Sequence, residues 1–502
     1  MFKKKKSKEV IVRGNTRLAI KVGFWYTFAT FLTRGIAFIT TPIFSRVMTK
    51  ADYGEFSNFA SWQATLLILV SAELYSTVSR AYYDYKDDYD KYVSSIIAGS
   101  LILSCVYYLI FMLCGSSIYN IVNIPPQYVH IMFFTMMCMS CRSTFLARER
   151  TLYHYKKVIL ISIVGTLLPT IISVFLVCSM ATPYQLSARI YGFYIPSSMV
   201  GLTCAIVLLL RGRSFRMEHI RYALKLSIPL LVNYLTIYLL TSTNVIITKS
   251  VLGKEQAAVM SIAASVIHIL TALFHALSGA VTTWIMDNIN QQNYSKLRRE
   301  LSVYTMGISI LALGVILLAP EVVFILGGKA YLESVRLIPF YVLSVLIHTM
   351  MAVFTIILTY DKNIKATAIS ATCVSGLSIF VKIWLLPLFS LQILTIINSV
   401  AFAILFTLNY IFVRRAGYAE ALNLKGFLLP IGGVLVFCLS SFYLYENDIA
   451  RYAVIAVIGI CFAAFAYKNK QTLLNIVKKK KGNKKVEASA ENDPDGDSID
   501  AI

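Results

Sequence analysis

Charged residues are scarce in this chain. Asp, Glu, Lys and Arg together make up 14% of its 502 residues, whereas 57% are hydrophobic. Because a soluble globular domain carries about 25% charged residues, the composition excludes an ordinary soluble protein. Acidic residues are scarcer than basic ones, with 25 aspartates and glutamates against 47 lysines and arginines. Within the apolar stretches Glu73 is the one clearly buried carboxylate in the sequence pattern.

Long polar loops are also missing. Short connections separate fourteen apolar segments, and each segment is long enough to cross a bilayer as a helix. We predict spans at residues 18–48, 58–80, 92–115, 126–146, 158–180, 190–210, 226–252, 257–286, 301–326, 337–360, 366–387, 391–413, 426–445 and 451–467. The fold class predicted is therefore an all-α integral membrane protein of about fourteen transmembrane helices.

Cysteine indicates neither redox chemistry nor a metal site. All nine cysteines fall in apolar stretches. Cys138 and Cys141 have the spacing of a redox pair, but they lie inside a predicted span without a βαβ context. The sequence therefore favours a packing role for them, and we predict no metal site and no cofactor.

Lysine and arginine are concentrated in alternate connections, beginning with the basic N-terminus. Positive residues accumulate in cytoplasmic loops, so we predict that both termini are cytoplasmic. A net charge of +22 follows from this pattern and from the two lysine-rich ends, which can contact anionic lipid. We therefore predict no nucleic-acid partner. The acidic segment that closes the chain has the composition of a disordered tail.

Two segments of the chain are faintly similar. SRVMTKADYGEFSNFA (45–60) aligns with TKSVLGKEQAAVMSIA (248–263), which pairs Arg46 with Lys249. One segment joins the first two predicted spans and the other joins spans seven and eight. Because the offset is an even number of spans, the halves share an orientation, as in parallel repeats that hold a substrate path between them. We predict these parts: a basic N-terminus 1–17, an N-lobe 18–210, a loop 211–225, a C-lobe 226–413, two further helices within 426–467 and a tail 468–502.

The sequence resembles a known family. The resemblance rests on TRGIAFITTPIFSRVMTKADYGEF (33–56), SRAYYDY (79–85), LKLSIPLLVNYL (224–235) and TSTNVIITKSVLG (241–253). These segments are similar to the polysaccharide and O-antigen flippases of the multidrug/oligosaccharidyl-lipid/polysaccharide (MOP) exporter superfamily. The resemblance implies a V-shaped pair of six-helix lobes around a cavity, with two extra C-terminal helices, in the inner membrane of a bacterium.

The resemblance also implies a substrate. It would be an isoprenoid-diphosphate-linked oligosaccharide, such as an O-antigen, capsule or exopolysaccharide repeat unit, moved to the outer leaflet by alternating access. Membrane lipids and a polysaccharide polymerase are the further partners considered, and we expect a monomer. A cation-coupled multidrug exporter is the alternative. A glycan polymerase or glycosyltransferase is a less favoured alternative, because the outer loops are too short and carry too few charged residues to form a catalytic site. We therefore expect no enzyme activity and no catalytic residue.

Five basic residues are candidates for binding the anionic diphosphate: Arg34, Arg46, Arg80, Lys249 and Lys382. Arg34 lies near the middle of the first span, where an unpaired charge costs roughly 2.5–3.5 kcal/mol and usually faces a polar interior. Arg suits phosphate because its guanidinium can bind two oxygens. For Arg46, Arg80 and Lys249 the alternative is snorkelling to the membrane surface. Lys382, placed deep in span eleven, either contacts substrate or pairs within its own lobe.

Four polar residues are candidates for lining the cavity or for coupling transport to an ion. Glu73 lies two helical turns before Arg80, so it either neutralises Arg34 or carries a coupling ion. Asn233 and Asn244 share a face of span seven and suit sugar hydroxyls, with hydrogen bonding between helices as the alternative. His268 lies in span eight and can titrate near neutral pH, although packing is the simpler interpretation.

Overall fold

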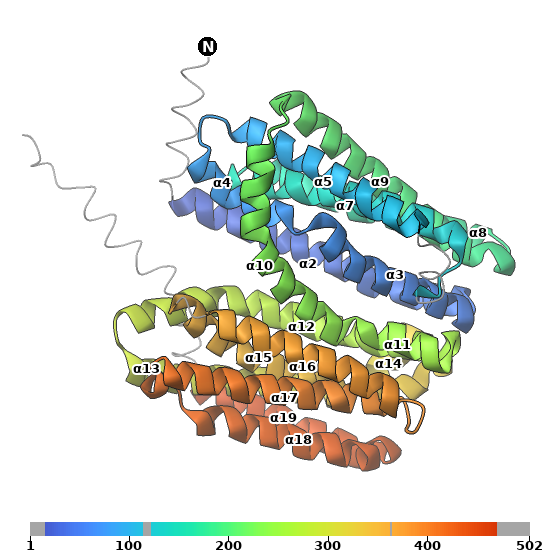
Figure 1. Ribbon diagram of the computed structural model, residues 1–502. Coiled ribbons are helices and arrows are strands. Elements are labelled where there is room, and N and C mark those ends of the chain that lie inside the picture. The colour runs from blue at the N-terminus through green and yellow to red at the C-terminus, as the bar shows by residue number, and fades with distance from the viewer. Residues whose placement is uncertain (1–15, 114–121, 362–363, 469–502) are drawn as a thin grey trace, which may run out of the picture. The chain divides into compact units, whose positions relative to one another are not determined.

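The computed structural model describes residues 16–113, 122–361 and 364–468, and no strand occurs among them (Figure 1). The helices of the first half are α2 (Thr16–Val47), α3 (Lys50–Ser71), η1 (Leu74–Thr77), α4 (Val78–Asp84), α5 (Tyr89–Leu113), α7 (Pro126–Thr151), α8 (Tyr155–Ser179), η2 (Thr182–Tyr184) and α9 (Gln185–Gly212). The second half contains α10 (Met217–Thr241), α11 (Thr243–Leu252), α12 (Lys254–Asn290), α13 (Tyr294–Leu317), α14 (Ala319–Gly327), η3 (Lys329–Leu337), α15 (Ile338–Tyr360), α16 (Ile364–Leu385), α17 (Gln392–Arg415), η4 (Ala419–Ala421), α18 (Leu424–Glu446) and α19 (Asp448–Lys468).

Ten of the described helical segments are long and apolar enough to cross a membrane. They correspond to predicted spans three to six and eight to thirteen. The other four predicted spans correspond to α2, α3, α10 with α11, and α19. The all-α membrane fold is therefore confirmed, while the count of fourteen spans stays a prediction.

The chain forms two compact units. The first contains Met1–Ala272, Ala319–Ser344 and Lys365–Leu405, and the second contains Leu273–Leu318, Val345–Ile364 and Phe406–Ile502. Helices α12, α15 and α17 each contribute residues to both. The predicted division into two six-helix lobes stays a prediction.

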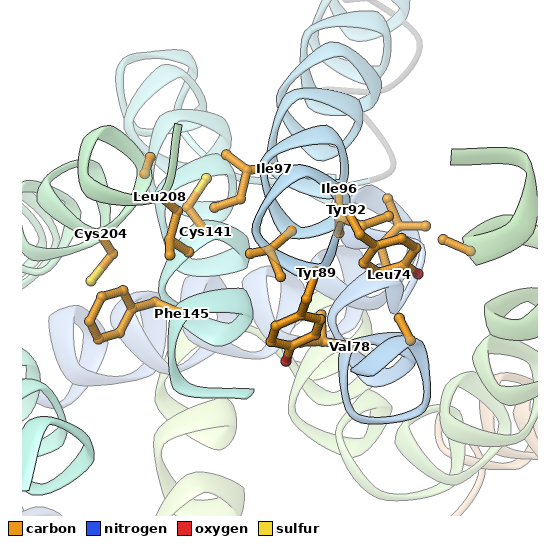
Figure 2. Packing of buried hydrophobic residues seen from close by; sticks show 14 of the residues in the cluster. Leu74, Val78, Tyr89, Tyr92, Ile96, Ile97, Cys141, Phe145, Cys204 and Leu208 are labelled. Atoms are coloured by element: carbon orange, nitrogen blue, oxygen red, sulfur yellow. The ribbon is translucent and has the colours of Figure 1, made fainter. Parts of the chain in front are cut away.

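The first unit has a packed core at the ends of α4, α5, α7 and α9 (Figure 2). The labelled residues of this core are Leu74, Val78, Tyr89, Tyr92, Ile96, Ile97, Cys141, Phe145, Cys204 and Leu208, and each is less than one-tenth exposed. Tyr92 also forms a hydrogen bond of 2.7 Å with Thr77, so its hydroxyl is not left unpaired in the core. Cys138 and Cys141 are both buried free thiols.

The second unit is held by aromatic and polar contacts of its own. Phe354 packs against Phe406 and Phe427 with ring centres 4.8 and 5.1 Å apart. Thr305 on α13 donates a hydrogen bond of 2.8 Å to the carbonyl of Gly426, and so α13 is tied to α18. Aromatic packing and a cross-helix hydrogen bond are the interactions that hold helices together where lipid supplies no hydrophobic driving force.

The helix predicted over residues 58–80 is broken. Helix α3 ends at Ser71, and Ala72 and Glu73 both adopt left-handed backbone conformations, with φ of 45° and 53°. The chain then continues as η1 and α4. The prediction that Glu73 and Arg80 share a helical face was therefore wrong, because no continuous helix connects them. Helices interrupted within a span are characteristic of transporter binding sites.

Candidate functional site

The end of α2 caps the end of α14. The last carbonyls of a helix have no partner within that helix. The Ser45 hydroxyl donates to the carbonyl of Leu326 at 2.6 Å, and Arg46 Nη2 donates to the carbonyls of Phe324 and Ile325 at 3.2 and 3.0 Å. The positive guanidinium also complements the negative end of the α14 dipole. Two side chains of the predicted N-lobe thus fasten a helix of the predicted C-lobe.

A buried ion pair lies at the neighbouring contact between α3 and α11. Lys249 Nζ lies 2.5 Å from Glu55 Oε1, and the two side chains are only 3% and 2% exposed. Lys249 also donates to the carbonyl of Asn123. Lys254, which is half exposed, approaches the other oxygen of Glu55 at 3.2 Å. We call Ser45, Arg46, Glu55, Lys249 and Lys254 the end cluster.

Gly54 allows α3 to approach α12 closely. A Cβ atom at this position would overlap the carbonyl oxygen of Lys254 and crowd the amide of Ala258. Only glycine has no Cβ, so it permits this approach between the two backbones. The segments 45–60 and 248–263, which the sequence suggested to be repeats, therefore meet in the first unit through an ion pair and a backbone contact.

A second polar group lies at the junction of α10 and α11. Helix α10 ends at Thr241, where its last carbonyls need partners outside the helix. Lys382 is fully buried and donates to the carbonyl of Leu240 at 3.2 Å, and the Tyr341 hydroxyl donates to the carbonyl of Thr241 at 3.3 Å. Asn244, also fully buried, lies beside Tyr341. Lys382 thus provides a hydrogen-bond donor for one carbonyl at the interrupted end of α10.

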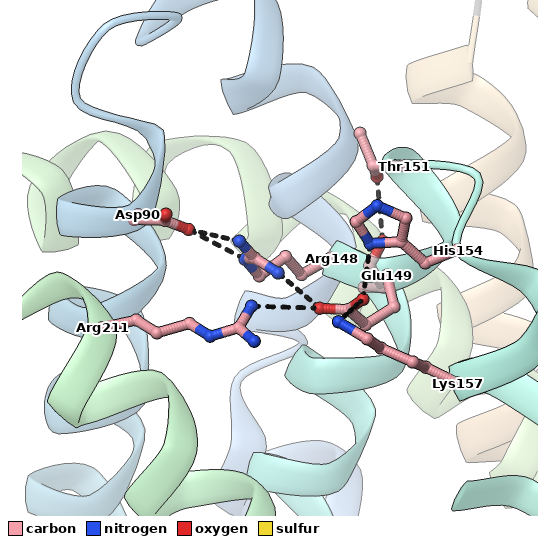
Figure 3. Close-up of polar contacts among 8 residues, drawn as sticks. Asp90, Arg148, Glu149, Thr151, His154, Lys157 and Arg211 are labelled. Atoms are coloured by element: carbon pink, nitrogen blue, oxygen red, sulfur yellow. Dashed lines mark hydrogen bonds and ion pairs between the residues drawn. The ribbon is translucent and has the colours of Figure 1, made fainter. Parts of the chain in front are cut away.

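Charged side chains join four helices around Glu149 (Figure 3). The Glu149 side chain is fully buried and contacts four basic groups: Arg148, His154 at 2.7 Å, Lys157 at 3.5 Å and Arg211 at 3.7 Å. Arg148 also binds Asp90 on α5 at 2.6 Å. Because these residues come from α5, α7, α8 and α9 or the turns beside them, the Glu149 network holds the ends of these helices together.

The turn between α4 and α5 is tied to the start of α10. Asp88 accepts a hydrogen bond of 2.7 Å from Lys91 and one of 3.1 Å from Arg216. The pKa of Asp88 lies below its usual value, mainly because of the hydrogen bond from Lys91 and to a smaller extent because of the positive charge of Arg216. This contact fastens the beginning of α10 to the turn that precedes α5.

The predicted basic residues have different surroundings. Arg34 lies on α2, but its side chain is outside the described part of the structure. Arg80 is exposed and lies 3.6 Å from Asp84. Arg46 and Lys249 are engaged in the end cluster. Lys382 lies in the last turn of α16 and is fully buried, and its depth in the predicted span stays a prediction.

The predicted polar residues are only partly described. Glu73 is buried, and no described residue forms a hydrogen bond with its Oε2 atom. The side chain of Asn233 lies outside the described residues, and the α10–α11 junction separates it from Asn244. His268 is exposed on α12. The roles proposed for these residues stay predictions.

Arg189 was not among the predicted site residues. It falls in the connection before the predicted span 190–210, but α9 begins at Gln185 and therefore includes it. Its guanidinium lies 3.5 Å from the ring centre of Phe44 and 4.4 Å from that of Phe56, and it donates to Ser173 at 2.9 Å. Cation–π contacts of this kind gain strength when the cation is desolvated. Among the described residues, no group of three His, Cys, Asp or Glu side chains is arranged to hold a metal ion.

Comparison with known proteins identifies the family. Residues 19–289, more than half of the chain, match the family described as "Polysaccharide biosynthesis protein". The chain belongs to this polysaccharide biosynthesis protein family. No curated protein matches the sequence significantly.

Solved structures share the fold of this family member. "Lipid II flippase MurJ, inward closed conformation" is 16% identical with a TM-score of 0.67, and the match covers 88% of this chain and 99% of that one. A "multidrug resistance MATE family transporter of the MOP superfamily" is 12% identical with a TM-score of 0.58, over 77% and 95% of the two chains. A MOP superfamily transporter from Pyrococcus furiosus is 12% identical with a TM-score of 0.51, over 80% and 96%. The predicted kinship with polysaccharide biosynthesis proteins is confirmed by the family match, and these solved structures show that the fold is shared.

Proposed function

We propose that this polysaccharide biosynthesis protein is a flippase for an isoprenoid-diphosphate-linked glycan. It would carry an O-antigen, capsule or exopolysaccharide unit from the cytoplasmic to the outer leaflet of a bacterial inner membrane, with both of its own termini cytoplasmic. The family match to polysaccharide biosynthesis supports the glycan, and the fold shared with a lipid II flippase supports a lipid-linked one. A hydrated cavity removes the cost of taking a charged, hydroxyl-rich head group through hydrocarbon.

The end cluster is the observation that carries the proposal. It joins the two segments that connect the first two spans of each half, which the predicted topology places at the outer surface. Alternating access requires a seal that is stable in one state and separable in the next. An ion pair, a helix cap and a glycine contact can separate without unfolding any helix, so we assign the end cluster as the outer seal.

The basic residues of the seal have a second role in this proposal. While the seal is closed, Glu55 forms an ion pair with Lys249, and the α14 carbonyls accept hydrogen bonds from Arg46. When it opens, both cations lose these partners at the outer end of the path. An anionic diphosphate can then bind them in place of the protein groups, since charge-assisted hydrogen bonds to phosphate are strong.

Reconstitution tests the function. Purified protein in liposomes is supplied with a fluorescent isoprenoid-diphosphate-linked oligosaccharide, and a membrane-impermeant glycosidase reports how much glycan reaches the outer leaflet. We expect the protein to accelerate this exposure, Arg34→Ala to abolish it and Arg34→Lys to retain part of it. Equal rates with and without protein would reject the flippase, and efflux of a cationic dye without glycan movement would favour the multidrug exporter.

A further inference from the structure

A cavity of about 470 Å³ lies between α2 and α8, away from the end cluster. Its lining consists of Trp25, Tyr155, Lys156, Ile159, Leu160 and Ile163. Its size falls within the range of about 300–1,000 Å³ that is usual for small-molecule sites. Leu160 is 60% exposed, so the cavity opens sideways into the surroundings of the helices.

The residues that line the cavity change from polar to aliphatic along α8, as a lipid changes from head group to acyl chain. On α8 it follows positions 156, 159, 160 and 163, which form one helical face. The first turn of this face carries Tyr155 and Lys156, and the aliphatic residues follow along the helix. Tyr, Trp and Lys are typical of the membrane interface, and aliphatic residues are typical of the acyl region. The cavity therefore offers one end to a polar head group and the other to a hydrocarbon chain.

The adjacent residues Lys156 and Lys157 have different partners. Lys157 lies 3.5 Å from the buried carboxylate of Glu149. Lys156 lines the cavity, and no ion pair involving it occurs among the described residues. The cavity thus presents one basic side chain, that of Lys156, at its head-group end, and this side chain is available to an anionic group.

We propose that this cavity binds an anionic phospholipid of the cytoplasmic leaflet. One acyl chain lies along Ile159, Leu160 and Ile163 against Trp25, and the lipid phosphate contacts Lys156. Basic pockets between transmembrane helices on the cytoplasmic side are suited to anionic head groups. The proposal does not depend on the flippase activity, because it concerns binding to the protein itself.

The test compares lipids of one acyl composition. Full-length protein is purified in detergent, and phosphatidylglycerol or phosphatidylcholine is added while the melting temperature and the bound lipid, by native mass spectrometry, are recorded. We expect phosphatidylglycerol to stabilise the protein more than phosphatidylcholine does. Lys156→Gln should weaken its binding about fivefold, which corresponds to the ~1 kcal/mol typical of one basic residue near an anionic lipid. Lys157→Gln is the matched control, and its effect should be much smaller.

A second variant addresses the acyl chain. Ile163→Trp fills the cavity without changing charge, and we expect it to remove the preference for phosphatidylglycerol while the protein still melts cooperatively. Equal stabilisation by the two lipids, equal effects of the two lysine variants, or full binding to Ile163→Trp would each overturn the proposal. Stabilisation by geranylgeranyl diphosphate but not by phosphatidylglycerol would overturn it in favour of an isoprenoid chain.

Discussion

Removing the Glu55 carboxylate should open the outer seal. In Glu55→Gln, Lys249 stays buried with the Asn123 carbonyl as its remaining described partner. Breaking a buried ion pair by removing one member typically costs about 3–5 kcal/mol, because the other charge is left uncompensated. This cost applies only to the closed arrangement, since an open seal lets water reach Lys249. The variant should therefore shift the equilibrium toward the open state rather than unfold the protein.

The structure also predicts an asymmetry between the two members of the pair. In Lys249→Gln, Glu55 keeps Lys254 at 3.2 Å, and Lys254 is half exposed. The positive charge of Lys254 therefore partly compensates the Glu55 carboxylate, so the closed arrangement loses less free energy than it does in Glu55→Gln. At 1.4 kcal/mol for each factor of ten, a loss of about 3 kcal/mol corresponds to roughly a hundredfold shift for Glu55→Gln. We expect a clearly smaller shift for Lys249→Gln.

The opening can be followed by cysteine labelling at the seal. Ser45→Cys places a thiol where the buried serine now bonds to Leu326, in a background with all native cysteines replaced by serine. Labelling by a membrane-impermeant maleimide then reports how often the seal opens. Glu55→Gln should raise the rate by roughly two orders of magnitude. Combining it with Lys249→Gln should reverse much of the effect, since both charges are then gone.

Two results would refute this reasoning. An unchanged labelling rate in Glu55→Gln would mean that the ion pair does not hold the seal. A double variant as open as Glu55→Gln alone would mean that an uncompensated Lys249 is not the cause. A cooperative melting transition in each variant is the control for folding.

Three further outcomes follow from the packing. Gly54→Ala should destabilise the closed arrangement by about 1–3 kcal/mol, because the new methyl group overlaps the Lys254 carbonyl, and faster maleimide labelling at Ser45→Cys would show it. Glu149→Gln should lower the free energy of unfolding by about 3 kcal/mol, as denaturant unfolding would measure. This value is the lower end of the range for a broken buried ion pair, because several basic partners of Glu149 are partly exposed to solvent. Lys382→Met should change stability by less than about 1.5 kcal/mol, the value of the lost hydrogen bond to Leu240, yet reduce glycan exposure in liposomes if the charge serves transport. Unchanged flipping in Lys382→Met would restrict that lysine to packing.

The membrane fold was predictable because hydropathy alone determines where long helices cross lipid. Interruptions within the spans were not predictable. The segment around Ala72 and Glu73 contains neither glycine nor proline, yet both residues adopt positive φ. Such a conformation costs free energy at residues with a side chain, and it persists only where tertiary contacts hold it. Local sequence carries no sign of those contacts, so the helix over 58–80 was predicted to be continuous.

Site residues were predictable by charge and depth, but their partners were not. Lys249 and Arg46 were found as basic residues at equivalent points of a repeat. Glu55 was missed, although it is an acid in a short segment predicted to lie at the outer surface. Arg189 was missed because a boundary error of five residues moved it from a helix to a loop. Pairing across helices distant in sequence depends on packing, which one sequence does not determine.

The pairing changes how the basic residues should be interpreted. In the closed arrangement Lys249 neither reaches the membrane surface nor is free to bind substrate, because it is buried against a carboxylate of another helix. Its repeat counterpart Arg46 instead caps α14. The two equivalent positions of the predicted repeat thus make two different contacts, an ion pair and a helix cap. Because the two interactions use different partners, variants of Glu55 and of the α14 cap should weaken the seal independently, and their effects on labelling at Ser45→Cys should add unless one movement opens both.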